Sequence, residues 1–388
     1  MASGSRPYVT TDVSTTPFQR SISLSPVTNH LYVISRTAAN AGLTVNVLDA
    51  NTGADLYRLK TNGIGPSGTI MLAFMAVADD GAVYASSISI TNGVTIYRWA
   101  DDNGATLPSI VFSGVVDPGA ASNTRWGDSL AVSGQGPNTM LSLDAFNSTR
   151  TTLLRWSDSS MTSLVVTNYT HSYTNVSTGD TGKVLQFGPT NTYFLKKKTT
   201  PTFVSEPLKL LRYDTPPTVT ELSSVNYYPQ VGLVAMDLSK KLAAGIFFST
   251  NASPTTAPAD RLIVYDISNF SSPLQVAQYN FPTNHQANGN FIGQIVFGSD
   301  KIFAVEGNNG IIAVPQAPAT VPSLRIALAG GSVVLSWTNT VPGFVLQSTP
   351  SLVPTTWNPV AQPVLENGNL NIVADTLGGG PQFYRLVK

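Results

Sequence analysis

The stretch LSPVTNHLYVIS, residues 24–35, decides the fold of this chain because its pattern returns five more times. In each copy an apolar strand ends in a tight turn of Ser, Pro, Asn, Asp or Gly, and a second strand rich in aliphatic or aromatic residues follows. The turns recur about every 50 to 60 residues, a period typical of the four-stranded blades of a β-propeller. The other copies are VADDGAVYAS (77–86), VSGQGPNTMLSL (132–143), FGPTNTYFL (187–195), MDLSKKLAAGIFF (236–248) and FGSDKIFAV (297–305).

Each copy continues into a third strand that ends in a polar turn. Alternating polarity and many β-branched or aromatic residues predict these strands at 44–50, 95–101, 152–158, 208–214, 261–267 and 310–316. Five of the six then pass through a short turn into a fourth strand, whereas the proline-rich stretch 315–323 prevents this in the sixth. We therefore expect the segment Tyr8–Phe18 to supply the missing strand and close the ring, because an unpaired edge invites aggregation.

The sequence thus predicts an all-β protein. Residues 1–316 are expected to form a six-bladed β-propeller, residues 317–323 a Pro- and Ala-rich linker, and residues 324–388 a small C-terminal β-sandwich. In this tail, short strands alternate with turn signals such as Glu366-Asn367-Gly368 at the spacing of such a sandwich. No stretch has the period and caps of a long helix.

Composition narrows the class of protein. The chain has 22 basic and 22 acidic residues and no cysteine. Disulfides, thiolate nucleophiles and cysteine-bound metals are therefore excluded, and no charge excess attracts nucleic acid. A surface made polar by hydroxyls and amides favours an extracellular or cell-surface protein. The start MASGSRPYVTTD lacks the apolar core of a signal peptide, so the numbering begins after a removed signal, reflects a recombinant form, or belongs to a protein that stays inside the cell.

Two resemblances support this localisation. The tail, with LSW, GFVLQST, WNPV and QFYRL, resembles a C-terminal domain found on secreted and surface proteins of environmental bacteria. The repeats, with SLSPVTNHLYVISRT, VLDANTGADL and VADDGAVYA, are similar to an uncharacterised family of extracellular bacterial propellers. The resemblance implies location and architecture, and it carries over no catalytic residue.

The strand order separates two ends of the propeller. First-to-second and third-to-fourth turns are short and share one end, the short-turn end. The opposite, long-loop end carries the second-to-third loops and the crossings between blades, at 36–43, 60–68, 87–94, 117–128, 144–151, 167–181, 196–207, 225–230, 249–260 and 280–290. We expect any ligand or partner site there, because long loops on a rigid scaffold usually carry recognition.

Aromatic residues at the long-loop end are the first candidates for ligand binding. Rings among hydroxyls and amides suit the faces of sugars or a protein partner, although they could instead pack over the ends of neighbouring blades. These residues are Tyr169, Tyr173, Tyr227 and Tyr228.

Three charged or titratable residues are expected to share this end and to converge near the channel: Arg125, His171 and His285. Their spacing matches no ligand motif, so we expect neither a metal nor a cofactor. The run Lys196–Lys198 is expected to be a solvated loop end. Acidic clusters such as Asp79-Asp80-Gly81 and Asp101-Asp102-Asn103-Gly104 are interpreted as turns rather than calcium loops.

The leading hypothesis is a non-catalytic extracellular or cell-surface protein. Its long-loop end would bind a glycan or a protein, or copies of itself in a surface layer or filament, and the tail would attach, sort or assemble it. The alternative is a propeller enzyme, a hydrolase or lyase, with carboxylates or histidines converging at the channel mouth. The sequence contains no nucleophile-elbow serine and no carboxylate pair with acid and base spacing.

Overall fold

A computed structural model describes residues 1–10, 19–171, 182–197, 207–227, 231–248, 260–282, 288, 291–316, 324–338, 343–367, 370–376, 378 and 380–387. The chain divides into two compact units, Met1–Gln316 and Ala317–Lys388, here called the N-terminal and C-terminal units. The regular elements of the described residues are all strands apart from one short 3-10 helix, η1 (Gly136–Asn138). No helix among them is long and apolar enough to cross a membrane.

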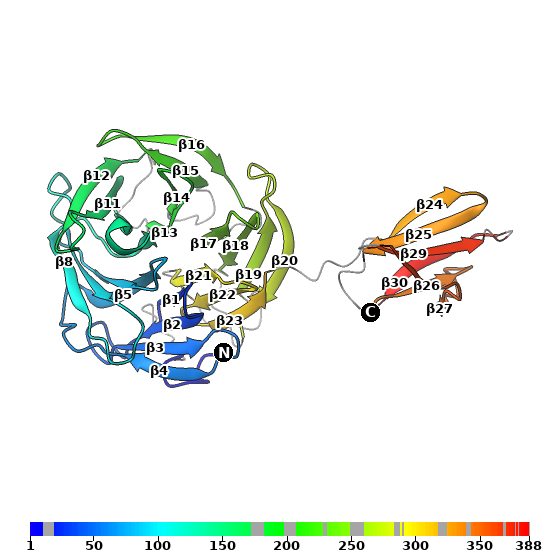
Figure 1. The fold of residues 1–388 in the computed structure, drawn as a ribbon, viewed down its shortest axis with the longest axis horizontal. Coiled ribbons are helices and arrows are strands. Elements are labelled where there is room, and N and C mark those ends of the chain that lie inside the picture. The colour runs from blue at the N-terminus through cyan, green and yellow to red at the C-terminus, as the bar shows by residue number, and fades with distance from the viewer. Residues whose placement is uncertain are drawn as a thin grey trace. The chain divides into compact units, whose positions relative to one another are not determined.

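Six antiparallel sheets make up the described part of the N-terminal unit (Figure 1). The first contains β1 (Ser21–Leu24), β2 (His30–Ser35), β3 (Thr44–Asp49) and β4 (Asp55–Leu59). The second contains β5 (Ile70–Val77), β6 (Val83–Ile88), β7 (Gly93–Trp99) and β8 (Ser109–Val115). The third contains β9 (Ala131–Ser133), β10 (Met140–Asp144), β11 (Arg150–Trp156) and β12 (Leu164–Thr170).

The other three sheets follow the same plan, with each strand paired to its neighbour in sequence. The fourth contains β13 (Gly182–Phe187), β14 (Thr192–Lys197), β15 (Leu208–Tyr213) and β16 (Val219–Val225). The fifth contains β17 (Leu233–Asp237), β18 (Leu242–Phe247), β19 (Arg261–Asp266) and β20 (Leu274–Asn280). The sixth has three strands, β21 (Gly293–Phe297), β22 (Lys301–Glu306) and β23 (Gly310–Pro315).

The first strands of the sheets line the inside of a ring. In Figure 1, β1, β5, β13, β17 and β21 gather at the centre, and β4, β8, β12, β16 and β20 lie at the periphery. Inner strands contact one another in the order β1, β5, β9, β13, β17 and β21, and β21 contacts β1 again. This ring of antiparallel, mostly four-stranded sheets is consistent with a propeller.

Neighbouring sheets pack face to face because their inner strands carry apolar side chains on both faces. Between the first two sheets, for example, Tyr32 of β2 packs in one cluster with Leu72 of β5 and Trp99 of β7. Trp126 and Trp156 are buried in the cluster between the second and third sheets. Trp99, Trp126 and Trp156, the tryptophans of the repeats, therefore belong to the core.

The N-terminal segment differs in part from its expected role. Tyr8 and Val9 are buried in a cluster with residues of the first and last sheets. However, the described residues 8–10 form no ladder with β23. The two backbone hydrogen bonds to that strand come from Met1, whose amino group donates to the Ile311 carbonyl at 2.6 Å and whose carbonyl accepts from the Ile311 amide at 2.9 Å. Residues 11–18 of the predicted strand lie outside the described part.

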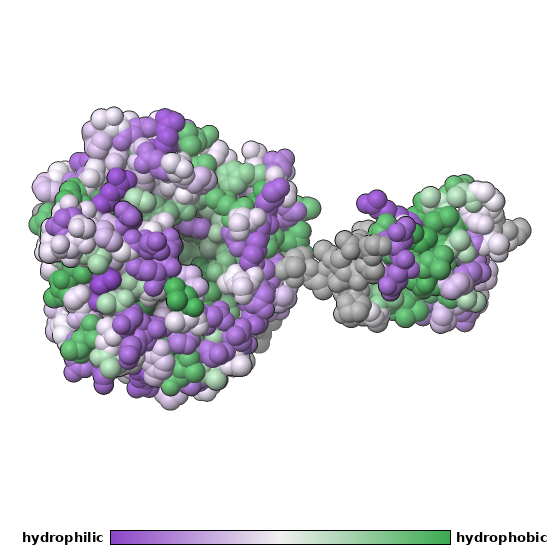
Figure 2. All heavy atoms as spheres, viewed as in Figure 1, coloured by the Kyte–Doolittle hydropathy of each residue, from purple (hydrophilic) through white to green (hydrophobic). Residues whose placement is uncertain are grey.

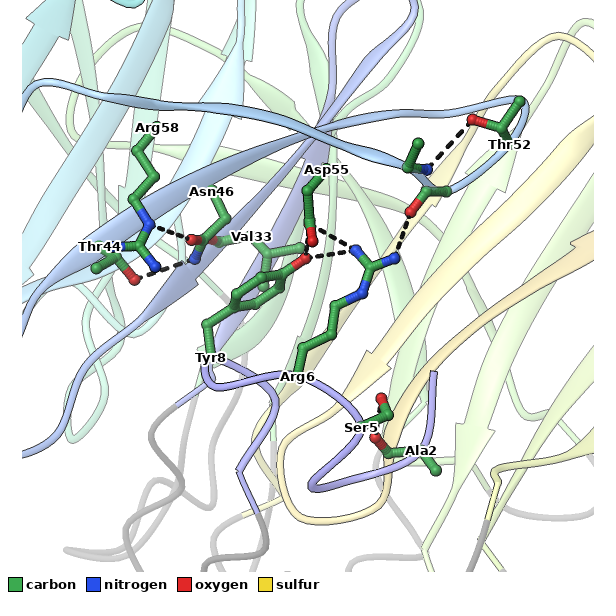
Figure 3. Close-up of polar contacts among 12 residues, drawn as sticks. Ala2, Ser5, Arg6, Tyr8, Val33, Thr44, Asn46, Thr52, Asp55 and Arg58 are labelled. Carbon is green, nitrogen blue, oxygen red and sulfur yellow. Dashed lines mark hydrogen bonds and ion pairs between the residues drawn. The ribbon is translucent and has the colours of Figure 1, made fainter.

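Polar contacts hold this segment against the first sheet (Figure 3). Arg6 donates to the Asp55 carboxylate at 2.6 Å and to the Gly53 carbonyl at 2.7 Å, and the Tyr8 hydroxyl also binds Asp55. Asp55 begins β4, the outer strand of that sheet. The start of the chain therefore bridges the first and last sheets, with Met1 rather than Tyr8 beside β23.

The short turns use their acidic residues to satisfy backbone donors. The Asp80 carboxylate accepts from the Ala82 amide at 3.1 Å, and Asp101 accepts from the Asn103 amide at 3.0 Å. Both hydrogen bonds have the pattern of an Asx turn. The acidic clusters at 79–81 and 101–104 therefore act as turn residues in the structure.

The C-terminal unit contains two antiparallel sheets. One is β24 (Arg325–Ala329), β25 (Ser332–Thr338), β29 (Leu370–Thr376) and β28 (Leu365–Asn367), and the other is β27 (Asn358–Pro359), β26 (Val345–Thr349) and β30 (Phe383–Val387). Leu335, Trp337 and Leu346 belong to its buried cluster, to which both sheets contribute. The unit therefore has its own small core.

Candidate functional site

The buried charged side chains of the N-terminal unit gather at its long-loop end. Burying a charge is costly, so such residues are rare unless they are paired. By contrast, the aspartates of the short turns described above, at 79, 80 and 101, are exposed. The buried set comprises Arg20, Arg36, Asp117, Asp128, Asp144, His171, Lys196, Lys197, Asp260 and Glu306.

Asp144, at the end of β10, is the centre of one such cluster. The Lys197 ammonium, from the end of β14, lies 2.9 Å from Asp144 Oδ2, and His171 Nε2 lies 3.3 Å from Oδ1. Thr151 donates its hydroxyl proton to Oδ1 at 2.8 Å. Lys197 also donates to the carbonyls of Ala145 and Ser148, at 2.5 and 2.6 Å. The cluster therefore fixes the β10–β11 loop to the neighbouring sheet.

The electrostatics of this cluster favour a charged Asp144 and a neutral His171. Burial acts to raise the pKa of the Asp144 carboxyl, but the Lys197 charge and the contact with His171 outweigh it, and the pKa lies below its usual value. Burial lowers the pKa of His171 more than Asp144 raises it. We infer an ion pair between Asp144 and Lys197, with His171 as a neutral hydrogen-bonding neighbour.

Asp128 is the centre of a second cluster, which lies beside the inner strand β9. Arg125 forms a bidentate pair with its two carboxylate oxygens, at 2.6 and 2.7 Å. Nη2 of Arg20, the residue before β1, lies 3.8 Å from Asp128 Oδ1. Arg36 follows β2 and is close enough to Arg20 for the two charges to repel. Arg125 and Arg20 therefore approach the Asp128 carboxylate, and Arg36 lies near Arg20.

Glu306 is the centre of a third cluster. Its carboxyl accepts hydrogen bonds from the Asn288 side chain and from the Asn308 amide, the latter at 3.0 Å. Burial, followed by the nearby charge of Asp260, raises the pKa of Glu306 to about 8. Glu306 is therefore largely protonated at neutral pH, and it anchors the β22–β23 loop as a neutral acid.

One described loop presents an apolar side chain to solvent. Ile90, between β6 and β7, is 52% exposed. Ser89 exchanges backbone hydrogen bonds with Trp126 at 3.1 and 3.0 Å, and the Asn92 amide donates to the Thr124 carbonyl at 2.9 Å. The crossing between the second and third sheets therefore holds the loop on both sides of Ile90. Such a fixed, exposed apolar residue can contact a partner with little loss of conformational entropy.

A cavity of about 440 Å³ occupies the channel between the inner strands. The ring is hollowed at its centre, where apolar residues gather (Figure 2). The cavity lining includes Leu130, Val184, Leu233 and Ile295, and Asp79 is the carboxylate among its described lining residues. Gln186 of β13 and Gln294 of β21 also line it. Gln186 donates to the Met236 carbonyl of β17, and Gln294 donates to the Met75 carbonyl of β5 and accepts from the Ile22 amide of β1. The described lining thus resembles a packed channel with a few amides.

The structure corrects the expected exposure of two aromatic candidates. Tyr169 is 6% exposed and lies 4.8 Å, centroid to centroid, from the Tyr213 ring between the third and fourth sheets. Tyr227 is 5% exposed and packs edge-on against Tyr265. Both rings pack over the ends of neighbouring sheets, which was the alternative interpretation. Tyr173 and Tyr228 lie outside the described residues.

The two charged candidates that the structure describes, His171 and Arg125, are at the long-loop end, but they contact different carboxylates. His171 is buried beside Asp144, whereas Arg125 is half-buried beside Asp128. The backbone connects the two clusters, since the Asp144 amide donates to the side chain of Ser129 at 3.3 Å. His285 lies outside the described residues. The interpretation of Lys196 and Lys197 as a solvated loop end was wrong, because both side chains are buried.

Sequence reasoning missed Arg20, Arg36, Asp128, Asp144 and Glu306. A weak signal was present, because a charged residue ends or follows several of the otherwise apolar second strands, as in MLSLD, TYFLKK and KIFAVE. Since alternation places side chains on both faces of these buried strands, a charge there predicts a buried partner on the next sheet. The partner itself could not be read from the local sequence.

Comparisons with known proteins support the fold. No protein-family model matches the chain, and no curated protein matches it at a significant level. It is similar in structure to a DUF4623 family protein from Bacteroides eggerthii, with 18% identity over 77% of this chain and 70% of that chain and a TM-score of 0.55. This likeness shows the fold alone, and it is consistent with the expected resemblance to an uncharacterised family.

Two enzymes show weaker likeness. One is the periplasmic gluconolactonase of Pseudomonas aeruginosa, with 9% identity, 95% of this chain and 88% of that chain covered, and a TM-score of 0.44. The other is an oligogalacturonate lyase in complex with manganese, with 11% identity, 75% of each chain covered, and a TM-score of 0.41. At these scores neither likeness carries an argument about the function of this chain.

Proposed function

We propose that this chain is a non-catalytic extracellular or cell-surface binding protein. It uses the long-loop end of a six-bladed β-propeller to bind a glycan or a protein. The C-terminal unit is a small β-sandwich that attaches or sorts the propeller. The six sheets with their consecutive inner strands support the blade count, and the two sheets around Trp337 support the sandwich.

The observation that carries this proposal is the placement of buried charges at one end. A propeller needs only apolar packing between blades for stability, and a buried ion pair is weak support for stability compared with such packing. Here the buried polar contacts hold the bases of loops, as Lys197 does for residues 145 and 148. Loop bases that are fixed before binding lower the entropy cost of recognition.

No observation on the channel favours the enzyme alternative. Its described lining is largely aliphatic, and the Asp79 carboxylate lies in a short turn, at the end opposite the long loops. The buried carboxylates at the long-loop end, such as Asp144 and Glu306, bind side chains and backbone amides that hold the loops in place. These contacts suit carboxylates that support a binding surface better than carboxylates that act as a catalytic acid or base.

The proposal is tested by a glycan array and by pull-down from the surface of the source cells with the full chain. Ile90→Asp places a charge on the long-loop end, and Val27→Asp places the same charge in a short turn, where Val27 is 63% exposed. Ile90→Asp should abolish capture of the bound glycan or protein, and Val27→Asp should leave it unchanged. Equal loss in both variants, or loss in Val27→Asp alone, would contradict the proposal.

Sedimentation of the full chain separates partner binding from self-assembly. A monomer at micromolar concentration supports binding to a glycan or another protein. Large ordered particles that Ile90→Asp dissolves would instead identify a second copy of the chain as the partner of the long-loop end.

A further inference from the structure

We propose that β24 (Arg325–Ala329) of the C-terminal unit pairs with β24 of a second copy of this chain. The two strands run antiparallel, with Ala327 facing Ala327 across a twofold axis, and they join two four-stranded sheets into one. An open sheet edge, two uncovered apolar side chains and the self-complementary order of the residues support this pairing. It goes beyond the proposed function, because it concerns a surface of the C-terminal unit rather than the long loops of the propeller.

β24 forms an open edge of the four-stranded sheet (Figure 1). Among the described strands it pairs with β25 alone. Its register with β25 has no bulge, and its sequence RIALA contains no proline and a single charged residue, Arg325, at one end. Bulges, prolines and charges in mid-strand are the features that normally protect an edge from pairing with another chain. β24 therefore has the character of a strand that can add a partner.

The hairpin geometry shows which backbone groups of β24 point to the open edge. The two-residue turn at 330–331 has positive φ at both glycines, so the flanking pair Ala329–Ser332 is of the hydrogen-bonded kind. Pairs of the two kinds alternate along an antiparallel ladder, so the backbone groups of Ile326 and Leu328 point away from β25. A partner strand therefore meets two residues whose backbone donors and acceptors are directed at it.

The apolar side chains of β24 face the core side of the sheet but are not covered. Ile326 pairs with Leu335, and Leu328 pairs with Val333. Cross-strand partners point to the same face of a sheet, and Leu335 and Val333 are buried. Ile326 and Leu328 are nevertheless 63% and 77% exposed, so the three-stranded sheet does not extend over β24. Adjacent exposed apolar side chains of this kind are typical of an interaction surface.

The residue order favours a second copy of β24 as the occupant of this edge. With Ala327 on the twofold axis, Ile326 of each copy faces Leu328 of the other, and the four side chains share one face. Arg325 faces Ala329, so like charges do not oppose each other. The chain has a formal net charge of zero, so two copies do not repel each other at long range.

The other edge strands of the C-terminal unit are less suited to this pairing. β30 (Phe383–Val387) has the same length and forms an edge of the three-stranded sheet, but its central residue is Arg385. Antiparallel self-pairing there would place two guanidinium groups opposite each other. The edge strands β27 and β28 have two and three residues. Self-pairing is therefore favoured at β24.

Pairing through β24 alone predicts a weak dimer. Each copy contributes five residues, whereas a standard interface uses about 20–30 residues on each side. We therefore expect a monomer at about 1 µM and dimerisation with a Kd on the order of 0.1 mM.

Charge substitutions at Ala327 test the pairing in sedimentation of the full chain. Ala327 is exposed, so these variants should fold, and urea unfolding checks that they do. Ala327→Glu alone and Ala327→Lys alone should each weaken the dimer at least about tenfold, because like charges meet at the twofold axis. An equimolar mixture of the two variants should dimerise again, because Glu then faces Lys.

Cysteine substitutions test the register, since the chain has no cysteine of its own. Ala327 meets its symmetry mate as a pair without mutual hydrogen bonds, whose Cα atoms lie about 4.5 Å apart, within the range of a disulfide. Ala327→Cys should therefore form a disulfide-linked dimer under mild oxidation. Ala329→Cys is the matched control, because it is exposed on the same strand but faces Arg325, and it should not cross-link.

The proposal is overturned if the unmodified chain stays monomeric well above about 0.1 mM. It is also overturned if the mixture of charge variants does not dimerise, or if Ala329→Cys cross-links as readily as Ala327→Cys.

Ile90→Asp separates this inference from the proposed function. It should leave the dimer intact, and Ala327→Glu should leave capture of a glycan or protein intact. A dimer that Ile90→Asp dissolves would place the contact on the long loops and overturn the pairing of β24. Loss of capture in Ala327→Glu, without a dimer of the unmodified chain, would identify another protein as the occupant of β24 and overturn the pairing as well.

Discussion

Removal of the Lys197 charge should destabilise the N-terminal unit by about 3–5 kcal/mol. Lys197 and Asp144 are both buried, and their charged atoms are 2.9 Å apart. In Lys197→Met a side chain of similar length remains, so packing changes little. Among the described side chains, Asp144 then keeps Thr151 and the neutral His171, and the carbonyls of residues 145 and 148 lose a charged donor. The cost arises mainly from the buried carboxylate left without its counter-ion.

Urea unfolding followed by tryptophan fluorescence measures this cost. Trp99, Trp126 and Trp156 lie in the core of the N-terminal unit and report its transition. Lys301→Met is the matched control, because Lys301 pairs at 3.6 Å with Asp300, whose side chain is 70% exposed, and its loss should cost less than about 1 kcal/mol.

The double variant Asp144→Asn, Lys197→Met tests the cause. Removing both charges should cost clearly less than the sum of the two single changes, since no unpaired charge remains. A cost for Lys197→Met equal to that of Lys301→Met would refute the reasoning. Additivity of the two single changes would refute it as well.

Three further predictions concern other parts of the chain. Because the pKa of Glu306 rises from 4.5 to about 8 on folding, its contribution of about 5 kcal/mol should be present below pH 4.5 and lost as the pH rises to 8. Glu306→Gln should flatten this part of the pH profile in urea unfolding, and an unchanged profile would contradict the assignment. Gly127 has φ +93°, and a Cβ there would lie 1.8 Å from the Ser87 carbonyl oxygen, so Gly127→Ala should lower the melting temperature by several degrees or prevent folding. In the C-terminal unit, Leu328→Ser should change the unfolding free energy by less than about 0.5 kcal/mol, since Leu328 is 77% exposed, whereas Leu335→Ser should cost more than about 3 kcal/mol. Similar costs at the two positions would contradict the assigned core.

Strands and turns were largely predictable from the sequence because their signals are local. The expected third strand 208–214 is β15 (Leu208–Tyr213), and the expected third strand 261–267 is β19 (Arg261–Asp266). Period-2 alternation and turn residues act over a few neighbours, so a short window contains them. The assignment of loops to two ends followed from the same strand order.

The burial and the contact partners of the candidate side chains were much less predictable. Tyr169 and Tyr227 look exposed in a polar stretch, but the adjacent sheets cover both rings. Lys197 looks solvated as part of a basic run, yet it pairs with a carboxylate 53 positions earlier in the chain. The N-terminal segment was expected to close the ring through residues 8–18. Among the described residues Met1 pairs with Ile311 of β23, residues 8–10 do not, and residues 11–18 lie outside the described part.

The sequence by itself determined a repeating four-strand unit, the ends at which its loops emerge, and a separate β-rich tail. Only the tertiary structure decided which charges are buried and which meet. Asp144, His171 and Lys197 come from the ends of β10, β12 and β14, and Arg20 reaches Asp128 from a sheet two positions away in the ring. Such contacts depend on how the sheets pack around the channel. This packing brings together residues far apart in the chain and leaves no repeating pattern in the sequence.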